Sequence, residues 1–299
     1  MSISVWPIIS ADELKKEEDL SIERELAWLL ESLQETLVSL KSGLEDCYAL
    51  LAPIEPGSTL VMSSPRSESL KGHVTRVGTQ IVKGSLHLRL KTHAPLHLVL
   101  SPTSTLPLQP LVSLRTLLNE SLDCIDVTRW TGDKNSASFI SGQLRLLHSI
   151  LTEAKNQLKG QNLLAPNGGH DPETSWHTSP LAAEAFDPPL PSQVSLNLTI
   201  SDASLIMTIR VLEPANVTPN LGTRLAFAIG AQRRLEHDEM DEIFKYNGAE
   251  VRVVEKLRVE SADPSLMAAM AKLAALEHTV QLARNCLVAV MGGDDTDLE

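Results

Sequence analysis

The sequence predicts an α+β protein in which an antiparallel four-helix bundle accompanies a separate antiparallel β domain, both discontinuous in sequence. Two observations favour this fold class. Four stretches carry apolar residues in alternating steps of three and four, which places them on one face of an α-helix. Two further blocks carry apolar residues at every second position, which is typical of half-buried antiparallel strands. Aromatic residues make up only 3 % of the 299 residues, so the core must be mainly aliphatic.

The first predicted helix runs from about Ser21, a suitable N-cap, to Ala52, which precedes Pro53. Its apolar residues recur in steps of four and three, the a/d pattern of a leucine zipper. This zipper seam consists of Leu26, Leu30, Leu33, Leu37, Leu40, Leu44, Cys47 and Leu51. Residues 1–20 are polar and mixed in charge, and we expect them to be disordered.

Two β blocks are predicted, and each is too short to be stable alone. The strands are expected at 58–63, 70–77 and 80–91 in the first block, and at 194–200, 205–211, 225–229, 244–246 and 249–261 in the second. Asn247-Gly248 is the strongest short signal for a hairpin turn. We expect the blocks, at 56–104 and 190–261, to pair into one β domain.

Three further helices share the rhythm of the first. They are expected at about 107–130, 136–158 and 264–290, the last one opening on Asp263 as N-cap and Pro264 at the first helical position. The seam of the last helix contains Leu266, Ala269, Leu273, Leu276, Val280, Ala283, Leu287 and Val290. Four such helices in one chain can cover one another, so the segments 21–55, 105–160 and 262–292 predict the bundle. Residues 161–189 and 293–299 are expected to be disordered.

The charge and hydropathy of the sequence argue against nucleic acid as a partner and against insertion into a membrane. The net charge of −12 leaves no electrostatic basis for binding nucleic acid. A basic-zipper transcription factor needs lysines and arginines before its zipper, but Asp12–Glu25 holds seven acids and three bases. No apolar run approaches the roughly 20 residues of a membrane span, so direct membrane insertion is not expected.

No pattern in the sequence points to catalysis, a metal or a cofactor. Phosphate-binding loops, nucleophile elbows and zinc-protease motifs are missing. His87, His93 and His97 lie close in sequence, but no cysteine or acid has the spacing of a metal ligand. The acidic run 236–242 is either a solvated loop or a docking surface for a basic partner. The docking residues would be Glu236, Asp238, Glu239, Asp241 and Glu242.

Several stretches, taken in order, resemble the Rogdi leucine-zipper family, whose fungal counterpart is the smaller, non-catalytic subunit of the RAVE complex. Glu25-Leu26-Ala27-Trp28-Leu29-Leu30 resembles the way in which the first helix of the family opens. Further resemblance lies at 70–72, 139–144, 186–192 and 244–261, the last followed by the final helix.

The resemblance implies a scaffold or adaptor subunit, not an enzyme, that promotes assembly of the vacuolar proton-pumping ATPase (V-ATPase) and hence vacuolar acidification. The implied partners are a large WD-repeat subunit of the RAVE/rabconnectin type, Skp1 and the peripheral sector of the V-ATPase. The implied location is the cytoplasm, with peripheral recruitment to vacuolar or endosomal membranes.

Two alternatives stay open from the residues themselves. The first is a stand-alone leucine-zipper homodimer that acts as a cytosolic interaction protein through Leu30, Leu37, Leu44 and Leu51. The second is an unrecognised hydrolase or small-molecule binder, for which a deep pocket with convergent polar groups would be the evidence.

Overall fold

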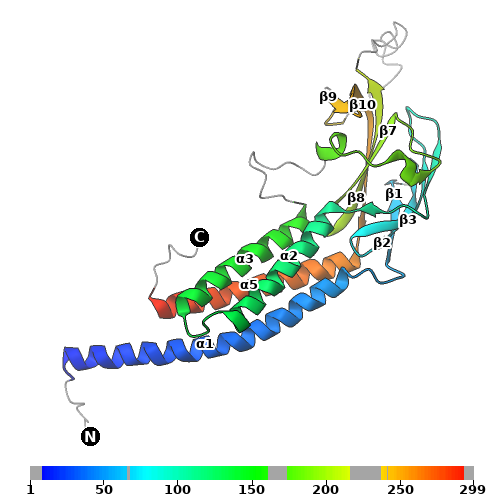
Figure 1. The fold of residues 1–299 in the computed structure, drawn as a ribbon. Coiled ribbons are helices and arrows are strands. Elements are labelled where there is room, and N and C mark those ends of the chain that lie inside the picture. Colours follow the sequence, from blue (N-terminus) through cyan, green and yellow to red (C-terminus); the bar gives the residue numbers. More distant parts are fainter. Residues whose placement is uncertain (1–8, 66–67, 161–173, 216–236, 241, 293–299) are drawn as a thin grey trace, which may run out of the picture. The chain divides into compact units, whose positions relative to one another are not determined.

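The computed structural model describes residues 9–65, 68–160, 174–215, 237–240 and 242–292 (Figure 1). Within these residues the long helices are α1 (Ala11–Leu50), α2 (Gln109–Asp126), α3 (Ala137–Lys159) and α5 (Pro264–Met291). The chain divides into two compact units. The helical unit comprises Met1–Asp46, Leu118–Thr152 and Lys272–Glu299, and the sheet unit comprises Cys47–Leu117 and Glu153–Ala271. No described helix is long and apolar enough to cross a membrane.

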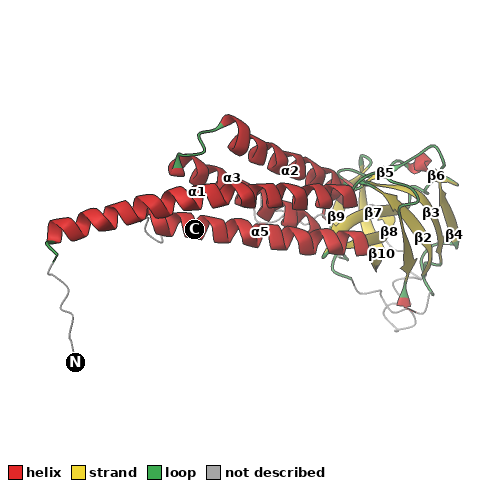
Figure 2. Ribbon diagram, turned by 90° about the horizontal axis from the view of Figure 1, so that it is seen from below, coloured by secondary structure: helices red, strands yellow, loops and turns green. Residues whose placement is uncertain are grey.

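The sheet unit contains two antiparallel sheets (Figure 2). The first follows the order β1 (Ser58–Ser63), β2 (Leu70–Val77), β3 (Gln80–Leu88), β4 (Leu96–Leu100) and β6 (Phe186–Asp187), with β5 (Leu106–Pro107) paired to β3. The second follows the order β7 (Val194–Ser201), β8 (Ser204–Pro214), β10 (Ala249–Ala262) and β9 (Ile243–Tyr246). Leu86 and Leu98 of the first sheet line the same small apolar space as Leu196 and Met207 of the second. The alternating leucines therefore face a core that both sheets share.

Local turn chemistry fixes both hairpins of the second sheet. Asn247 and Gly248 adopt φ values of 49° and 82°, the left-handed conformation that a two-residue turn between β9 and β10 requires. Asp202 and Ala203 do the same between β7 and β8, with φ values of 47° and 56°. The strand expected at 225–229 lies outside the described residues.

The prediction of an antiparallel four-helix bundle beside a separate β domain is wrong. The described residues form four long helices that are scattered along the chain among the strands of two antiparallel sheets. The seam of α5 shows the physical reason. Leu266 and Ala269 are buried in the sheet unit, whereas Leu273 and Val280 are buried in the helical unit. Heptad spacing identifies an apolar face but does not specify what covers it, so it cannot distinguish a helical neighbour from a sheet.

Contacts inside the helical unit join segments that are far apart in sequence. Lys41 of α1 donates to both carboxylate oxygens of Asp126 in α2, at 2.7 and 2.8 Å. Lys272 of α5 donates to Asp46 of α1 at 2.8 Å. The Thr152 hydroxyl of α3 donates to Glu277 of α5 at 2.8 Å. These polar contacts lie at the margins of an aliphatic interior made by the seam leucines.

A buried ion pair ties β2 to the start of α5 in the sheet unit. Arg76 Nε lies 2.6 Å from Asp263 Oδ2, and both side chains are almost fully buried. The second oxygen, Oδ1, accepts a hydrogen bond from the Ser265 backbone N–H at 2.9 Å, so Asp263 also caps the helix as the sequence predicts. One carboxylate thus connects a strand and a helix that 187 positions separate in sequence.

Two stretches differ from the predicted disorder. The helix α1 begins at Ala11, ten positions before the predicted N-cap. Residues 174–189 contain the short helices η3 (Thr174–His177) and η4 (Ala183–Ala185) and the strand β6. The disorder expected for 1–8, 161–173 and 293–299 concerns residues outside the described part of the chain.

Candidate interaction surface

The predicted seam residues are buried to different degrees. Leu26, Leu276, Ala283 and Val290 are half-buried. The remaining seam residues are buried: Leu30, Leu33, Leu37, Leu40, Leu44, Leu51, Leu273, Val280 and Leu287. The rest of the described chain covers these buried seam residues, so they offer no free face to a partner.

Two of the predicted docking acids, Asp238 and Glu239, lie on a described turn that precedes β9. Arg210 of β8 donates two hydrogen bonds to the carboxylate of Glu239, one from Nε and one from Nη2, at 2.7 Å each. Lys256 of β10 donates to Glu239 at 2.8 Å and to Asp238 at 2.8 and 3.0 Å. Two acids and two cations thus form one network, which we call the acidic turn network (Asp238, Glu239, Arg210 and Lys256). Glu242 is exposed, and Glu236 and Asp241 lie outside the described residues.

The network shifts the pKa values of three of its members, Asp238, Glu239 and Lys256, in the direction that favours the charged form. The hydrogen bond from Lys256 holds the pKa of Asp238 below its ordinary value. Burial raises the pKa of Glu239, but the hydrogen bonds from Arg210 and Lys256 outweigh burial, so the pKa of Glu239 also falls. Burial lowers the pKa of Lys256, and its two carboxylate partners reverse that effect and raise the pKa. Asp238, Glu239 and Lys256 therefore stay charged across the physiological range.

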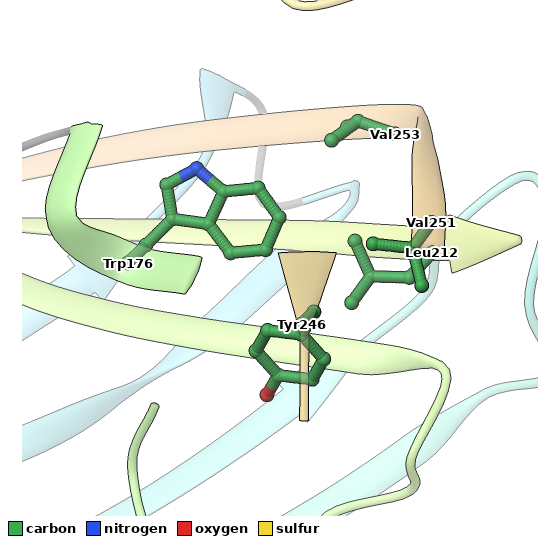
Figure 3. Packing of buried hydrophobic residues seen from close by; sticks show 5 residues of the cluster. All are labelled: Trp176, Leu212, Tyr246, Val251 and Val253. Atoms are coloured by element: carbon green, nitrogen blue, oxygen red, sulfur yellow. The ribbon is translucent and has the colours of Figure 1, made fainter. Parts of the chain in front are cut away.

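A cluster of buried hydrophobic residues around Trp176 (Figure 3) lies against the buried cation of this network, Arg210. The Arg210 side chain is 0 % exposed, and its guanidinium carbon lies 4.7 Å from the centroid of the Trp176 ring. Trp176 is 2 % exposed and comes from η3. It packs with Leu212, Tyr246, Val251 and Val253, and Phe244 packs against the same cluster. The turn is consequently fixed on a rigid part of the second sheet.

The geometry divides the predicted docking residues by role. The charge of Glu239 is neutralised within the chain, so it holds the turn in place. Asp238 is also paired with Lys256, but its side chain is 71 % exposed. Asp238 and Glu242 are thus the described acids that a basic partner could reach, and their docking role stays a prediction.

The sheet unit also contains a pocket of about 690 Å³. Hydroxyl and amide side chains from α2, α3 and β7 line it, among them Ser113, Asn156 and Asn197. Glu184 is the single ionisable residue among the described lining residues, so the pocket does not bring together an acid and a base for proton transfer. Leucine, proline and alanine side chains also line the pocket, so its surface is partly polar and partly apolar.

The histidines of the first sheet also come together. His87 of β3 and His97 of β4 stack with ring centroids 3.9 Å apart, and His97 Nε2 lies 3.1 Å from Ser85 Oγ. Both histidine side chains are exposed. Among the described residues, no group of three histidine, cysteine or acidic side chains is placed to hold a metal ion.

Sequence reasoning missed Arg210 and Trp176. Arg210 alternates with apolar residues on β8, a pattern that predicts a solvated side chain, yet η3 covers that face of the strand. Trp176 lies in a stretch rich in glycine and proline that predicts disorder. A tryptophan there was itself a signal, since so large an apolar side chain is usually buried at least in part.

Comparison with known proteins adds an independent observation. Residues 25–288 match the model of a family described as Rogdi leucine zipper containing protein. A Schizosaccharomyces pombe protein named "Regulator of V-ATPase in vacuolar membrane protein 2" is 25 % identical over 288 residues. That alignment covers 87 % of this chain and 91 % of the relative. The family match runs through the helical unit and the sheet unit alike.

Proposed function

The chain belongs to the Rogdi leucine zipper family, and from this membership we propose that it promotes assembly of the V-ATPase. The observation that carries the proposal is the extent of the match to a relative named as a V-ATPase regulator, which covers 91 % of that relative. A match of this extent includes the surfaces of both units, so a shared role would not depend on one small motif.

We assign the chain the part of a non-catalytic scaffold subunit in a RAVE-like complex. Its partners would be a large WD-repeat subunit, Skp1 and the peripheral sector of the V-ATPase. The chain would be recruited from the cytoplasm to vacuolar or endosomal membranes through them. The supporting observation is that the charged groups with shifted pKa values serve structural ion pairs, while the pocket of about 690 Å³ in the sheet unit lacks an acid and base pair.

A deletion and rescue experiment tests this function. Cells without the protein should carry less of the peripheral V-ATPase sector on vacuolar membranes and have a higher vacuolar pH. The full chain, used as bait, should co-purify with a WD-repeat protein and V-ATPase subunits in mass spectrometry. Normal pump assembly in the deletion strain, or absence of both partner classes from the purified complex, would refute the proposal.

The exposed acids of the turn form a second, separable part of the proposal. Glu242→Lys reverses a charge on the acidic turn, and Glu250→Lys reverses an exposed charge on the neighbouring strand β10. If a basic partner docks at the turn, Glu242→Lys should reduce co-purification of that partner and Glu250→Lys should not. Equal recovery with both variants would place the docking surface elsewhere.

The structure gives no support to the alternative of a homodimer through Leu30, Leu37, Leu44 and Leu51. Leu37, Leu44 and Leu51 are already buried by the chain, so a second copy could reach them only if the fold opened. Light scattering of the purified chain should give the monomer mass of 32.6 kDa.

A further inference from the structure

The first part of α1 is a helix that the rest of the described chain leaves uncovered. Every residue from Ile9 to Glu25 is exposed, and the first buried position is Leu30. In both views this part of α1 runs past the ends of the other helices of the helical unit (Figures 1 and 2). We call residues 9–25 the α1 extension.

The extension is helical because its own sequence specifies a helix start. The Ser10 hydroxyl accepts a hydrogen bond from the Glu13 backbone N–H at 3.3 Å, and Glu13 Oε2 accepts one from the Ser10 backbone N–H at 3.3 Å. This reciprocal pair is a capping box. Oppositely charged residues follow at helical spacing, as in Asp12 with Lys16 and Lys15 with Asp19. A helix start specified 20 positions before the first buried residue indicates that the extension itself has a use.

One face of the extension carries apolar residues that nothing in the described chain covers. Leu14, Ile22 and Leu26 lie on one face of the helix, because their spacing is eight and four residues. Leu14 is 59 % exposed and Ile22 is 44 % exposed. The stripe leads into the buried seam through the half-buried Leu26. It is therefore continuous with an interface that is already formed.

Charge defines what can cover this stripe. Glu18 stands four residues after Leu14 and four before Ile22, in the middle of the stripe. Glu17 and Asp19 flank it on either side. Across the segment, seven acids outnumber three bases: Asp12, Glu13, Glu17, Glu18, Asp19, Glu23 and Glu25 against Lys15, Lys16 and Arg24. A second copy of this helix would bring like charges together, and an anionic membrane surface would repel it.

We propose that the α1 extension docks an amphipathic helix of a different protein, whose apolar stripe is flanked by lysine or arginine and supplies a cation opposite Glu18. Leucine-like side chains of the partner would cover Leu14 and Ile22. A single charged residue within an otherwise apolar stripe would fix the register, as polar residues at core positions of coiled coils do. The inference goes beyond the proposed function, because the family match begins at residue 25, where the extension ends.

Two synthetic helical peptides provide the probe. Both have three heptads with leucine at the a and d positions, and they differ at the flanking positions, which are lysine in the basic peptide and glutamate in the acidic one. Fluorescence anisotropy measures their binding to the full chain. We expect the basic peptide to bind and the acidic peptide not to bind, with weaker binding of the basic peptide at high salt.

Matched variants locate the binding site. Leu14→Asp combined with Ile22→Asp, and separately Glu18→Lys, should each weaken binding of the basic peptide about tenfold or more. Val38→Asp, an exposed change elsewhere on α1, should leave it unaltered. All four substituted positions are exposed, so circular dichroism should show that every variant is folded.

Several outcomes would overturn the inference: no binding of the basic peptide, equal binding of both peptides, or binding that the extension variants do not change. Self-association of the chain that Leu14→Asp abolishes would show that a second copy covers the stripe, which also overturns it. None of these results would contradict the proposed role in V-ATPase assembly, because that role is tested separately, in cells and without the peptides.

Discussion

Adjacent positions on α1 show how strongly one side chain can determine stability. Leu37 is 1 % exposed and belongs to the seam, whereas Val38 is 48 % exposed. Successive residues of a helix point about 100° apart, so neighbours in sequence face different surroundings. The pair therefore separates the effect of burial from that of the substituted residue.

We expect Leu37→Asp to lower the free energy of unfolding by more than about 4 kcal/mol, because it would bury an unpaired carboxylate in the helical unit. Val38→Asp should change the free energy of unfolding by about 0.5 kcal/mol or less, because that site is exposed. Urea unfolding followed by circular dichroism gives both values. A small effect of Leu37→Asp would mean that the seam is not buried in solution.

At the acidic turn, Glu239→Gln removes the counter-charge of Arg210. Breaking a buried pair by removing one partner costs about 3–5 kcal/mol, because the remaining charge stays buried. The matched control is Asp238→Asn, where the carboxylate is exposed and the cost should stay below about 1 kcal/mol. Urea unfolding of the two variants distinguishes them. Equal losses would show that Arg210 does not depend on Glu239.

Sequence alone could predict the burial of Leu37 but not the ion pair between Glu239 and Arg210. A heptad position predicts burial wherever helices pack, so the leucine follows from spacing. The pairing of Glu239 with Arg210 links residues 29 positions apart through the fold of the second sheet. Periodicity carries no information on such a long-range contact, and the acidic run therefore predicts only a solvated loop or a docking surface.

At the scale of elements, the predicted strands of the first sheet and both hairpins of the second agree with the structure. Alternation defines a strand locally, and residues such as Asn247 and Gly248 define its turn. The sequence predicts the start of α1 at Ser21, where the apolar periodicity begins, whereas the helix starts at the capping box of Ser10 and Glu13. The residues of a helix do not specify which other elements will cover its apolar face. The predicted bundle is wrong for this reason.

The capping box leads to a prediction about the α1 extension. Ser10→Ala removes the cap and should destabilise the first turns of the helix by about 1 kcal/mol. Amide hydrogen exchange should therefore speed up in residues 11–20, while the global free energy of unfolding stays the same because this segment is exposed. Ser42→Ala, at an exposed position in the C-terminal part of α1, is the control and should not change exchange in residues 11–20. Unchanged exchange in Ser10→Ala would show that the cap contributes nothing.

For the molecule as a whole, the structural ion pairs with shifted pKa values are concentrated in the sheet unit. Burial raises the pKa of Asp263, but the hydrogen bond and positive charge of Arg76 outweigh burial and leave the pKa below its ordinary value. The carboxyls of Asp238 and Glu239 shift in the same direction. Three acids thus make this unit more dependent on pH than its hydrophobic core alone would.

The sign of that dependence follows from linkage. A carboxyl whose pKa is lowered in the folded state stabilises the protein fully above its ordinary pKa, near 4, and loses this contribution as the pH falls toward the lowered value. Lys256 behaves in the opposite way. Because its pKa is raised on folding, its contribution is complete below about pH 10.5 and is lost as the pH rises through the raised value.

We therefore expect a thermal unfolding midpoint that is nearly constant from about pH 5 to 9 and falls below about pH 4. The fluorescence of buried Trp176 reports on the sheet unit, provided that the other three tryptophans of the sequence, Trp6, Trp28 and Trp130, are replaced by phenylalanine. Asp263→Asn should lower the midpoint at pH 7 and flatten its decline in acid, because the variant has no carboxyl to protonate. Asp202→Asn, at an exposed turn, should retain the decline of the parent protein. An equally steep acid decline in Asp263→Asn and the parent would show that the pair with Arg76 does not control the acid stability of this unit.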